Sequence, residues 1–163
     1  MVYNLEALAS QHDFGVMEIL NYYVKNSFSA YFEDSLPLEF FTRLQEMSQG
    51  YPALVAKAPD GLIAGFAFLH PYHPAPAFRA VAELTYFIAP DHTRQGLGGL
   101  FLERLIADGR KMGLKKLLAS VSSLNEASLS FHQKQGFIQS GRLESVGLKF
   151  GREFDVVYLL KDI

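Results

Sequence analysis

The sequence predicts a single mixed α/β domain in which about four helices flank one central, mostly antiparallel sheet. Three observations lead to this fold class. The 163 residues suit one domain with a substantial core. The composition, 49% hydrophobic and 20% charged, is that of a globular chain. The apolar spacing is first helical, then that of strands joined by a tight turn, and finally that of strands alternating with helices. No repeat or linker divides the chain, so one domain is expected over residues 1–163.

Four helices are predicted where apolar side chains recur every three or four positions. They are expected at residues 12–25, 37–50, 98–112 and 125–135. Pro37 suits the first turn of the second helix, and Gly50 and Gly113 suit the ends of the second and third. The second helix is expected to bury Leu38, Phe41, Leu44 and Met47. The third is expected to bury Leu100, Phe101, Leu105 and Ile106.

Strands are predicted where apolar and β-branched residues cluster between turn residues. They are expected at residues 53–56, 62–69, 80–88, 116–121, 137–140 and 154–160, with a further piece near residues 146–150. Pro59, Asp60 and Gly61 supply a tight turn, so the first two strands should form a hairpin. Residues 70–76 contain three prolines and are expected to be irregular.

Charge and composition exclude several classes of function. A net charge of −2 offers no basic surface for nucleic acid or an anionic membrane. Without cysteine, disulfides, thiolate nucleophiles and zinc–thiolate sites are excluded. His70 and His73, in a proline-rich loop, do not complete a metal site. No apolar run reaches the roughly 20 residues that span a bilayer, and no signal-peptide pattern is visible. We therefore expect a cytoplasmic protein with no metal, nucleic-acid partner or membrane partner.

The stretch from Phe87 to Leu100 has the pattern of a phosphate-binding turn. A strand ends, a polar loop follows, Gly96, Gly98 and Gly99 fall within four residues, and an amphipathic helix starts. A helix N-terminus leaves N–H groups unpaired and attracts anions, and glycine lets the backbone approach an anion closely. The alternative is that these glycines serve only to pack the helix against the sheet.

Two common phosphate-binding fingerprints fail here. The dinucleotide pattern requires glycine at Phe101, and the Walker pattern requires Gly-Lys-Ser or Gly-Lys-Thr. The segment instead resembles the coenzyme A signature Q/R-x-x-G-x-G/A of the GNAT superfamily of N-acetyltransferases, with Thr93 where glutamine or arginine is usual. Other segments resemble the phosphinothricin and methionine sulfoximine acetyltransferase branch: residues 20–24, 52–56, 64–67, Phe78-Arg79 with Glu83, and the N-x-x-S-x-x-x-H-x-x-x-G-F stretch at 125–137.

The resemblance implies that acetyl-CoA is the co-substrate. Its diphosphate would be held by Arg94, Gln95, Gly96, Leu97, Gly98 and Gly99. Its pantetheine arm would pair with Tyr86, Phe87 and Ile88. Arg94 adds a positive charge that suits phosphate oxygens. Asn125 is an ordinary helix N-cap, to which the resemblance adds a contact with the coenzyme, and one residue is able to do both.

Glu83 stands in an otherwise apolar strand. In the resembling branch this glutamate is taken as the general base that removes a proton from the ammonium of the acceptor. Burial among apolar groups tends to raise the pKa of a carboxylate. The alternative is that Glu83 faces solvent or pairs with Arg79 on the same strand face. Many GNAT members use a tyrosine to protonate the leaving thiolate. Here Phe131 and His132 occupy that region, so His132, water and unassisted departure all stay open.

The resemblance also implies a small amino-acid-like amine as acceptor. The prospective acceptor pocket is lined by Tyr31, Phe32, residues 70–76 and Arg79. Arg79 would pair with the carboxylate or phosphinate of the acceptor. The alternative is that Arg79 is a structural partner of Glu83 or Asp91.

Three functions from different classes follow. The first is an N-acetyltransferase that moves the acetyl group of acetyl-CoA to the amine of a phosphinothricin-like or methionine sulfoximine-like acceptor. The second is a coenzyme A-binding module without transferase activity. The third is a structural protein in which the glycine-rich turn only packs. A homodimer is expected from the family and from the aromatic content.

Overall fold

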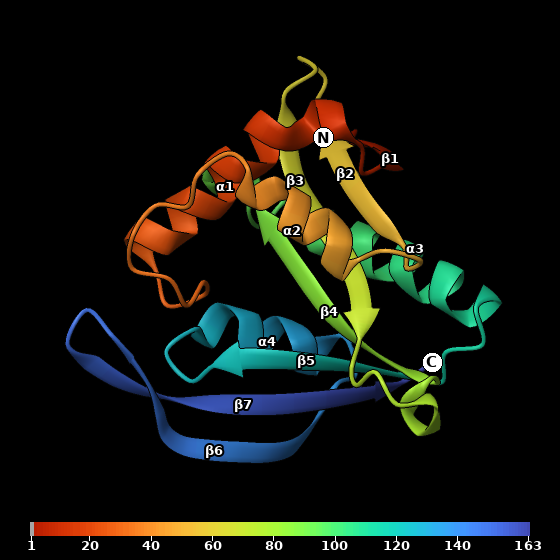
Figure 1. The fold of residues 1–163 in the computed structure, drawn as a ribbon, viewed down its shortest axis with the longest axis vertical. Helices are drawn as coiled ribbons and strands as arrows, with labels where there is room; N and C mark the ends of the chain where they lie inside the picture. The colour runs from red at the N-terminus through yellow and green to blue at the C-terminus, as the bar shows by residue number, and fades with distance from the viewer. Residues whose placement is uncertain (1) are drawn as a thin grey trace.

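The computed structural model describes residues 2–163, in which seven strands form one sheet with helices on both faces (Figure 1). The strands are β1 (Asn4–Ala7), β2 (Ala53–Lys57), β3 (Ile63–Pro71), β4 (Val81–Ile88), β5 (Lys116–Ser122), β6 (Ile138–Lys149) and β7 (Arg152–Asp162). The α-helices are α1 (Asp13–Asn26), α2 (Phe40–Met47), α3 (Leu97–Lys111) and α4 (Glu126–Lys134). Three short 3-10 helices are η1 (Ser10–His12), η2 (Pro76–Phe78) and η3 (Pro90–His92).

The strand order is β1-β2-β3-β4-β5-β7-β6. Every neighbouring pair is antiparallel except β4 and β5, which are parallel. The predicted fold class, a mixed and mostly antiparallel sheet flanked by four helices, is confirmed.

Two apolar cores hold the helices to opposite faces of the sheet. In Figure 1, α1 and α2 lie in front of the strands and α3 lies behind them. Val16 of α1 and Phe41 of α2 are buried with Phe66 of β3. Leu105 of α3 is buried with Ala67 of β3. Successive side chains of a strand point to opposite faces, so Phe66 and Ala67 contribute to different cores.

Strands β4 and β5 pair only at their first residues and then separate. Their register pairs run from Val81↔Lys116 to Glu83↔Leu118, although β4 continues to Ile88 and β5 to Ser122. Figure 1 shows the two strands diverging from a common end. No strand within residues 2–163 pairs with β4 on the β5 side beyond Glu83. We call residues 84–88 the unpaired edge of β4.

All four helices form, with differences in their buried sides. Helix α2 begins at Phe40 and not at Pro37, because the residues before it make consecutive turns whose hydrogen bonds span three residues and not four. Leu38 lies outside the helix and, like Met47, is exposed, so the predicted stripe of α2 is wrong at both ends. In α3, burial follows a four-residue spacing, Leu97, Phe101, Leu105 and Gly109, together with Leu102. Leu100 was predicted in this stripe but falls outside that spacing and is exposed. Among residues 2–163, none of the helices has the length and apolar character needed to cross a bilayer.

The predicted hairpin of β2 and β3 is confirmed, but three strand features differ from the prediction. Strand β3 runs on through His70 to Pro71, which pair with β4, so the prediction of irregular structure is wrong for these two residues. Proline is tolerated there because it lies at the end of the strand. Strand β1 was not predicted, because four residues carry too short a pattern. The separate pieces predicted near residues 137–140 and 146–150 form one long strand, β6, whose pairing with β7 shifts register twice.

Candidate active site

The glycine-rich turn leads from the end of β4 into helix α3. Gly96 is the N-cap of α3 and has a φ of 84°, in the left-handed region that glycine adopts without strain. Arg94 also has a positive φ, 60°, which is uncommon for a residue with a side chain. Arg94, Gln95 and Gly96 are all exposed. The turn therefore presents its backbone to solvent at the start of a helix.

The first amides of α3 are available to a ligand. The carbonyl of Gly96 accepts a hydrogen bond from the N–H of Leu100 at 3.2 Å, so the N–H groups of Leu97, Gly98 and Gly99 precede the first helical bond. A Cβ at Gly99 would meet no heavy atom within 4 Å, whereas a Cβ at Gly98 would lie 3.2 Å from the ring of Phe131. The alternative that these glycines serve only close packing therefore fits Gly98, whereas Gly96 and Gly99 border open space.

The turn is braced by Tyr3, a residue that the sequence analysis missed. Its buried hydroxyl donates to Oε1 of Gln95 at 2.9 Å and lies 3.1 Å from Nδ1 of His92. The Gln95 amide in turn donates to the carbonyl of Asp91 at 2.8 Å. No sequence pattern could have found this contact, because Tyr3 and Gln95 are 92 positions apart.

The backbone of the unpaired edge alternates between β3 and the open side. The N–H of Ala89, just after β4, donates to the carbonyl of Ala64 in β3 at 2.8 Å. The N–H of Tyr72, just after β3, donates to the carbonyl of Val81 in β4 at 3.5 Å. In an antiparallel pair the bonded residues alternate, so the odd-numbered residues of β4 bond to β3. The N–H and C=O groups of Tyr86 and Ile88 therefore point to the open side, and those of Phe87 point to β3.

The Ile88 carbonyl, on this open side, already accepts a hydrogen bond from a side chain of α1. The hydroxyl of Tyr23 in α1 donates to it at 2.6 Å. Tyr23 also packs against Phe87, with ring centroids 5.4 Å apart. These contacts fix the far end of the unpaired edge against α1, so its groups keep a defined direction.

Glu83 lies where β4 and β5 separate. It is half-buried, and its carboxylate accepts a hydrogen bond of 2.8 Å from the hydroxyl of Ser120 in β5. Arg79 is exposed and donates to the carbonyl of Pro76 at 3.0 Å. Arg79 forms no ion pair with Glu83 or Asp91 within residues 2–163, so the structural alternative for Arg79 does not hold there.

Residues 27–33, which we call the acceptor loop, contain two predicted lining residues, Tyr31 and Phe32, that pack against different elements. Tyr31 is half exposed, yet burial of the rest of its side chain raises its pKa to about 12, and the charge of Glu83 adds to this shift. The Tyr31 ring stacks on Phe154 of β7 at 5.6 Å. Phe32 packs edge-on against Phe40 of α2 at 5.5 Å and is half exposed.

Asn125 caps α4, as predicted. Its Oδ1 accepts from the N–H of Ser128 at 3.2 Å, and its Nδ2 donates to the hydroxyl of Ser29 in the acceptor loop at 3.1 Å. Asn125 therefore links the start of α4 to the acceptor loop, a contact that the sequence did not predict.

The two side chains at the predicted position of the general acid differ in character. Phe131 packs against Tyr86, with centroids 5.7 Å apart, and has no proton to give. His132 is buried, and its Nδ1 lies 2.8 Å from the carbonyl of Ser128, which fixes the proton on Nδ1. Burial lowers the pKa of His132, against a smaller opposing effect of this hydrogen bond. A neutral His132 with its proton on Nδ1 has no proton at Nε2.

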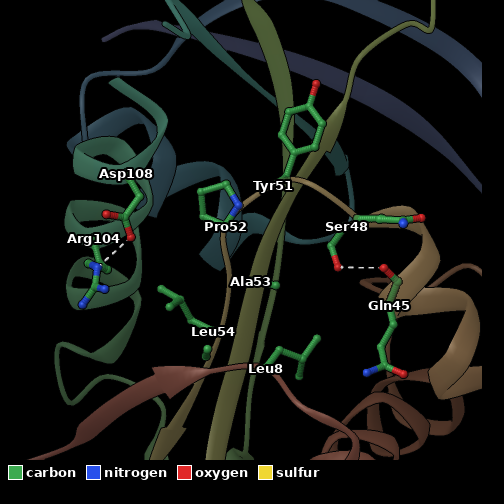
Figure 2. A pocket seen from close by; sticks show the side chains of 11 residues that line it. Leu8, Gln45, Ser48, Tyr51, Pro52, Ala53, Leu54, Arg104 and Asp108 are labelled. Atoms are coloured by element: carbon green, nitrogen blue, oxygen red, sulfur yellow. Dashed lines mark hydrogen bonds and ion pairs between the residues drawn. The ribbon is translucent and has the colours of Figure 1, made fainter. Parts of the chain in front are cut away.

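A separate hollow of about 440 Å³ lies between α2, the start of β2 and α3 (Figure 2). Arg104 and Asp108 form an ion pair on one side of it, and Ser48 and Gln45 lie on the other (Figure 2). None of the predicted site residues lines it. Within residues 2–163, no cluster of three or more potential metal-ligating side chains is present.

Free amides at a helix start, an unpaired strand edge and a carboxylate thus follow one another along a single segment. This is the arrangement of a protein that binds an extended, diphosphate-bearing coenzyme. Comparison with known proteins supports this class of coenzyme-binding protein. Residues 16–137 match the model of the acetyltransferase (GNAT) family, and the chain belongs to this family.

Named relatives share much of the sequence. The chain is similar to the L-methionine sulfoximine/L-methionine sulfone acetyltransferase of Pseudomonas aeruginosa, at 34% identity over 150 residues, which is 89% of this chain and 86% of the relative. It is also similar to the phosphinothricin N-acetyltransferase of Alcaligenes faecalis, at 41% identity over 72% of this chain and 59% of the relative. Several other matches also span less than two-thirds of the relative.

A solved structure shares the fold. The chain resembles yncA from Salmonella typhimurium, solved with its cofactor acetyl-CoA, with a TM-score of 0.90 and 26% identity over 99% of this chain and 94% of that one. The resemblance to the GNAT superfamily and to its phosphinothricin and methionine sulfoximine acetyltransferase branch is confirmed.

Proposed function

We propose that this protein transfers the acetyl group of acetyl-CoA to the primary amine of a small amino-acid-like acceptor. The observation that carries the proposal is that the free amides of α3, the unpaired edge of β4 and the carboxylate of Glu83 form one continuous track. From Ile88 to Glu83 the strand rises roughly 16 Å, which gives an extended arm room to lie along it. The named relatives are acetyltransferases of methionine sulfoximine and phosphinothricin, which are small amino-acid-like compounds.

The coenzyme would bind by its diphosphate and its arm. The backbone amides of residues 94–99 would hold the diphosphate, helped by the positive end of α3 and the charge of Arg94. The amides of pantetheine would pair with Tyr86 and Ile88, whose backbone groups point to the open side of β4. Phe87 would contribute only through its side chain, because its backbone bonds to β3. Asn125 lies at the start of α4 and would contact the arm while capping the helix.

Glu83 would act as the general base. The acceptor arrives as an ammonium, and Glu83 removes one proton directly or through a water. The amine nitrogen then attacks the thioester carbonyl, a C–N bond forms, the C–S bond breaks to release the thiolate, and the nitrogen gives its surplus proton to water as the amide forms. Phe131 has no proton to give, and a neutral His132 carries its proton on Nδ1 and none on Nε2. We therefore assign protonation of the thiolate to water.

The acceptor would lie near Glu83 and the acceptor loop. Tyr31 remains a neutral phenol at ordinary pH because its pKa is raised to about 12. Arg79 uses one N–H on Pro76, and its exposed guanidinium has further donors for a carboxylate or phosphinate. Phe32 would supply an apolar wall.

We also propose a homodimer. Strand β6 lies at the edge of the sheet and exposes several apolar side chains, namely Ile138, Leu143, Val146 and Leu148. Size-exclusion chromatography with light scattering tests this, and a monomeric mass at micromolar concentration would contradict it. A cytoplasmic location stays a prediction from the sequence.

The activity is tested by two measurements on the same protein. Acetyl-CoA should raise the melting temperature, and addition of methionine sulfoximine or phosphinothricin should release free thiol. Thermal protection without thiol release over a broad amine panel would favour a coenzyme-binding module instead. No protection at millimolar acetyl-CoA would exclude both functions.

A further inference from the structure

Lys149, the last residue of β6, is a fully buried lysine outside the track described above. Its side chain has no exposed surface. Its Nζ donates to three backbone carbonyls, those of Val24 at 2.8 Å, Ser27 at 2.7 Å and Ala30 at 2.6 Å. The last residue of β6 is thus hydrogen-bonded both to the end of α1 and to the beginning of the acceptor loop.

This arrangement satisfies a buried charge completely. An ammonium has three donors, and each has one of these carbonyls as acceptor. Val24 and Ser27 lie at the C-terminal end of α1, where unpaired carbonyls and the helix dipole favour a cation. Burial lowers the pKa of Lys149, while the charge of Glu33 opposes that shift. Removal of the ammonium would leave three buried carbonyls without their donor, which is costly.

The same loop is attached to the β6–β7 hairpin at two further points. The N–H of Phe150 donates to the carboxylate of Glu33, and Tyr31 stacks on Phe154 at 5.6 Å. Phe154 is able to sit there because residue 147 is glycine, since a Cβ at Gly147 would lie 2.2 Å from the Phe154 ring. The hairpin therefore supports the acceptor loop from Ser27 to Glu33.

We propose that Lys149 is a positioning residue for the acceptor side of the active site. By holding the carbonyls of Ser27 and Ala30, it fixes the acceptor loop and with it the stacking of Tyr31 on Phe154. Lys149 itself touches neither substrate, because it is fully enclosed. This inference rests on the proposed function, since it concerns the amine that the acceptor loop would receive.

The kinetic consequence is specific. The proposed coenzyme site lies mainly on β4 and α3, whereas the three acceptors of Lys149 lie on α1 and the acceptor loop. Asn125, which donates to Ser29, is the link between the loop and the coenzyme site. Loosening the acceptor loop should therefore weaken binding of the amine much more than binding of acetyl-CoA. A general loss of folding would instead reduce both.

The test compares Lys149→Met with Lys161→Met. Both changes remove an ammonium from a lysine that donates to backbone carbonyls, but Lys161 donates to one carbonyl, that of Gln135, outside the acceptor loop. For Lys149→Met we expect the KM for the amine to rise about tenfold and the Kd for acetyl-CoA to stay within about twofold. Hydrogen exchange of residues 27–33 should also become faster. Lys161→Met should change the amine KM, the Kd for acetyl-CoA and the exchange rate of residues 27–33 by less than about twofold each.

The inference is overturned if Lys149→Met leaves the amine KM and the exchange of residues 27–33 unchanged, or if acetyl-CoA affinity falls as much as amine affinity. Should Lys149→Met not fold, Glu33→Ala removes the acceptor of the Phe150 N–H at an exposed position and so loosens the same loop. It should raise the amine KM about two- to threefold with faster exchange, and unchanged values would count against the inference. If the unaltered protein acetylates no amine, the proposed function fails, and the exchange comparison alone then decides whether Lys149 fixes the loop.

Discussion

Ser120 of β5 donates a hydrogen bond of 2.8 Å to the carboxylate of Glu83 in β4, and Glu83 belongs to the last register pair, Glu83↔Leu118, before these strands separate. The contact orients the carboxylate through one oxygen, and no hydrogen bond from residues 2–163 reaches its second oxygen. A general base needs both a fixed position and a free lone pair.

Replacement of Glu83 tests its role as the base. Glu83→Gln keeps the shape and the contact with Ser120 but accepts no proton, so kcat should fall about 10²- to 10⁴-fold. The acidic limb of the pH–rate profile should disappear, and the Kd for acetyl-CoA should stay within about twofold. Ser120→Ala, as the matched control, keeps the base and should retain the acidic limb. An unchanged profile in Glu83→Gln would show that another group removes the proton.

Two substitutions at Gly99 separate coenzyme binding from folding. A side chain there meets no neighbouring atom, so neither change disturbs packing. Gly99→Ala should stabilise the protein by about 0.5–1 kcal/mol, since glycine is a poor helix former, and should largely keep affinity. Gly99→Asp should also favour the helix start, yet weaken acetyl-CoA binding by at least about tenfold through repulsion of the diphosphate. Chemical denaturation and calorimetric titration measure the two effects. Equal affinities for the Ala and Asp variants would move the diphosphate away from this turn.

The bracing of the turn by Tyr3 is tested by removal of one hydroxyl. Tyr3→Phe loses the bond to Gln95, whose net contribution to folding stability is about 1 kcal/mol, so the Kd for acetyl-CoA should rise by up to about fivefold. Tyr51→Phe, in the hollow shown in Figure 2, serves as the control and should leave the Kd unchanged. If Tyr3→Phe binds acetyl-CoA as tightly as the unaltered protein, the turn needs no brace from the N-terminal segment.

His132 should make stability depend on pH below neutrality. Burial lowers its pKa in the folded state, so below about pH 6.5 the unfolded chain takes up a proton that the folded chain does not. The contribution of neutral His132 to the free energy of unfolding is fully present above the pKa of the unfolded state. It is lost as the pH falls towards the pKa of the folded state, by at most about 1.4 kcal/mol per pH unit. His132→Asn keeps a donor near the Nδ1 position but does not titrate. The stability difference between the two proteins, measured by denaturation from pH 7.5 to 5, should shrink as the pH falls. A difference independent of pH would mean that His132 titrates normally.

The sequence predicted the helices, most strands and the glycine-rich turn, because apolar periodicity and turn residues are local signals. Leu38 and Leu100 were misplaced because helical spacing alone does not show where a helix begins or which flank of it meets the sheet. His70 and Pro71 were assigned to a loop because proline disfavours strands. The pairing of β3 with β4 outweighs that preference in the folded protein. The strand carrying Glu83 was predicted, but its separation from β5 was not.

The contacts between distant residues escaped prediction altogether. Tyr3 with Gln95, Asn125 with Ser29 and Lys149 with the end of α1 are each separated by about 90 or more positions. A single sequence gives no signal for such pairs, since each residue alone looks ordinary for its place. These contacts align the coenzyme track with the acceptor loop.

The most direct test of the account is a crystal structure with acetyl-CoA bound. We predict diphosphate oxygens within hydrogen-bond distance of at least two backbone amides among residues 94–99, with the arm paired to Tyr86 and Ile88 and the thioester next to Glu83. A diphosphate bound elsewhere, with those amides bonded to protein atoms, would contradict the account.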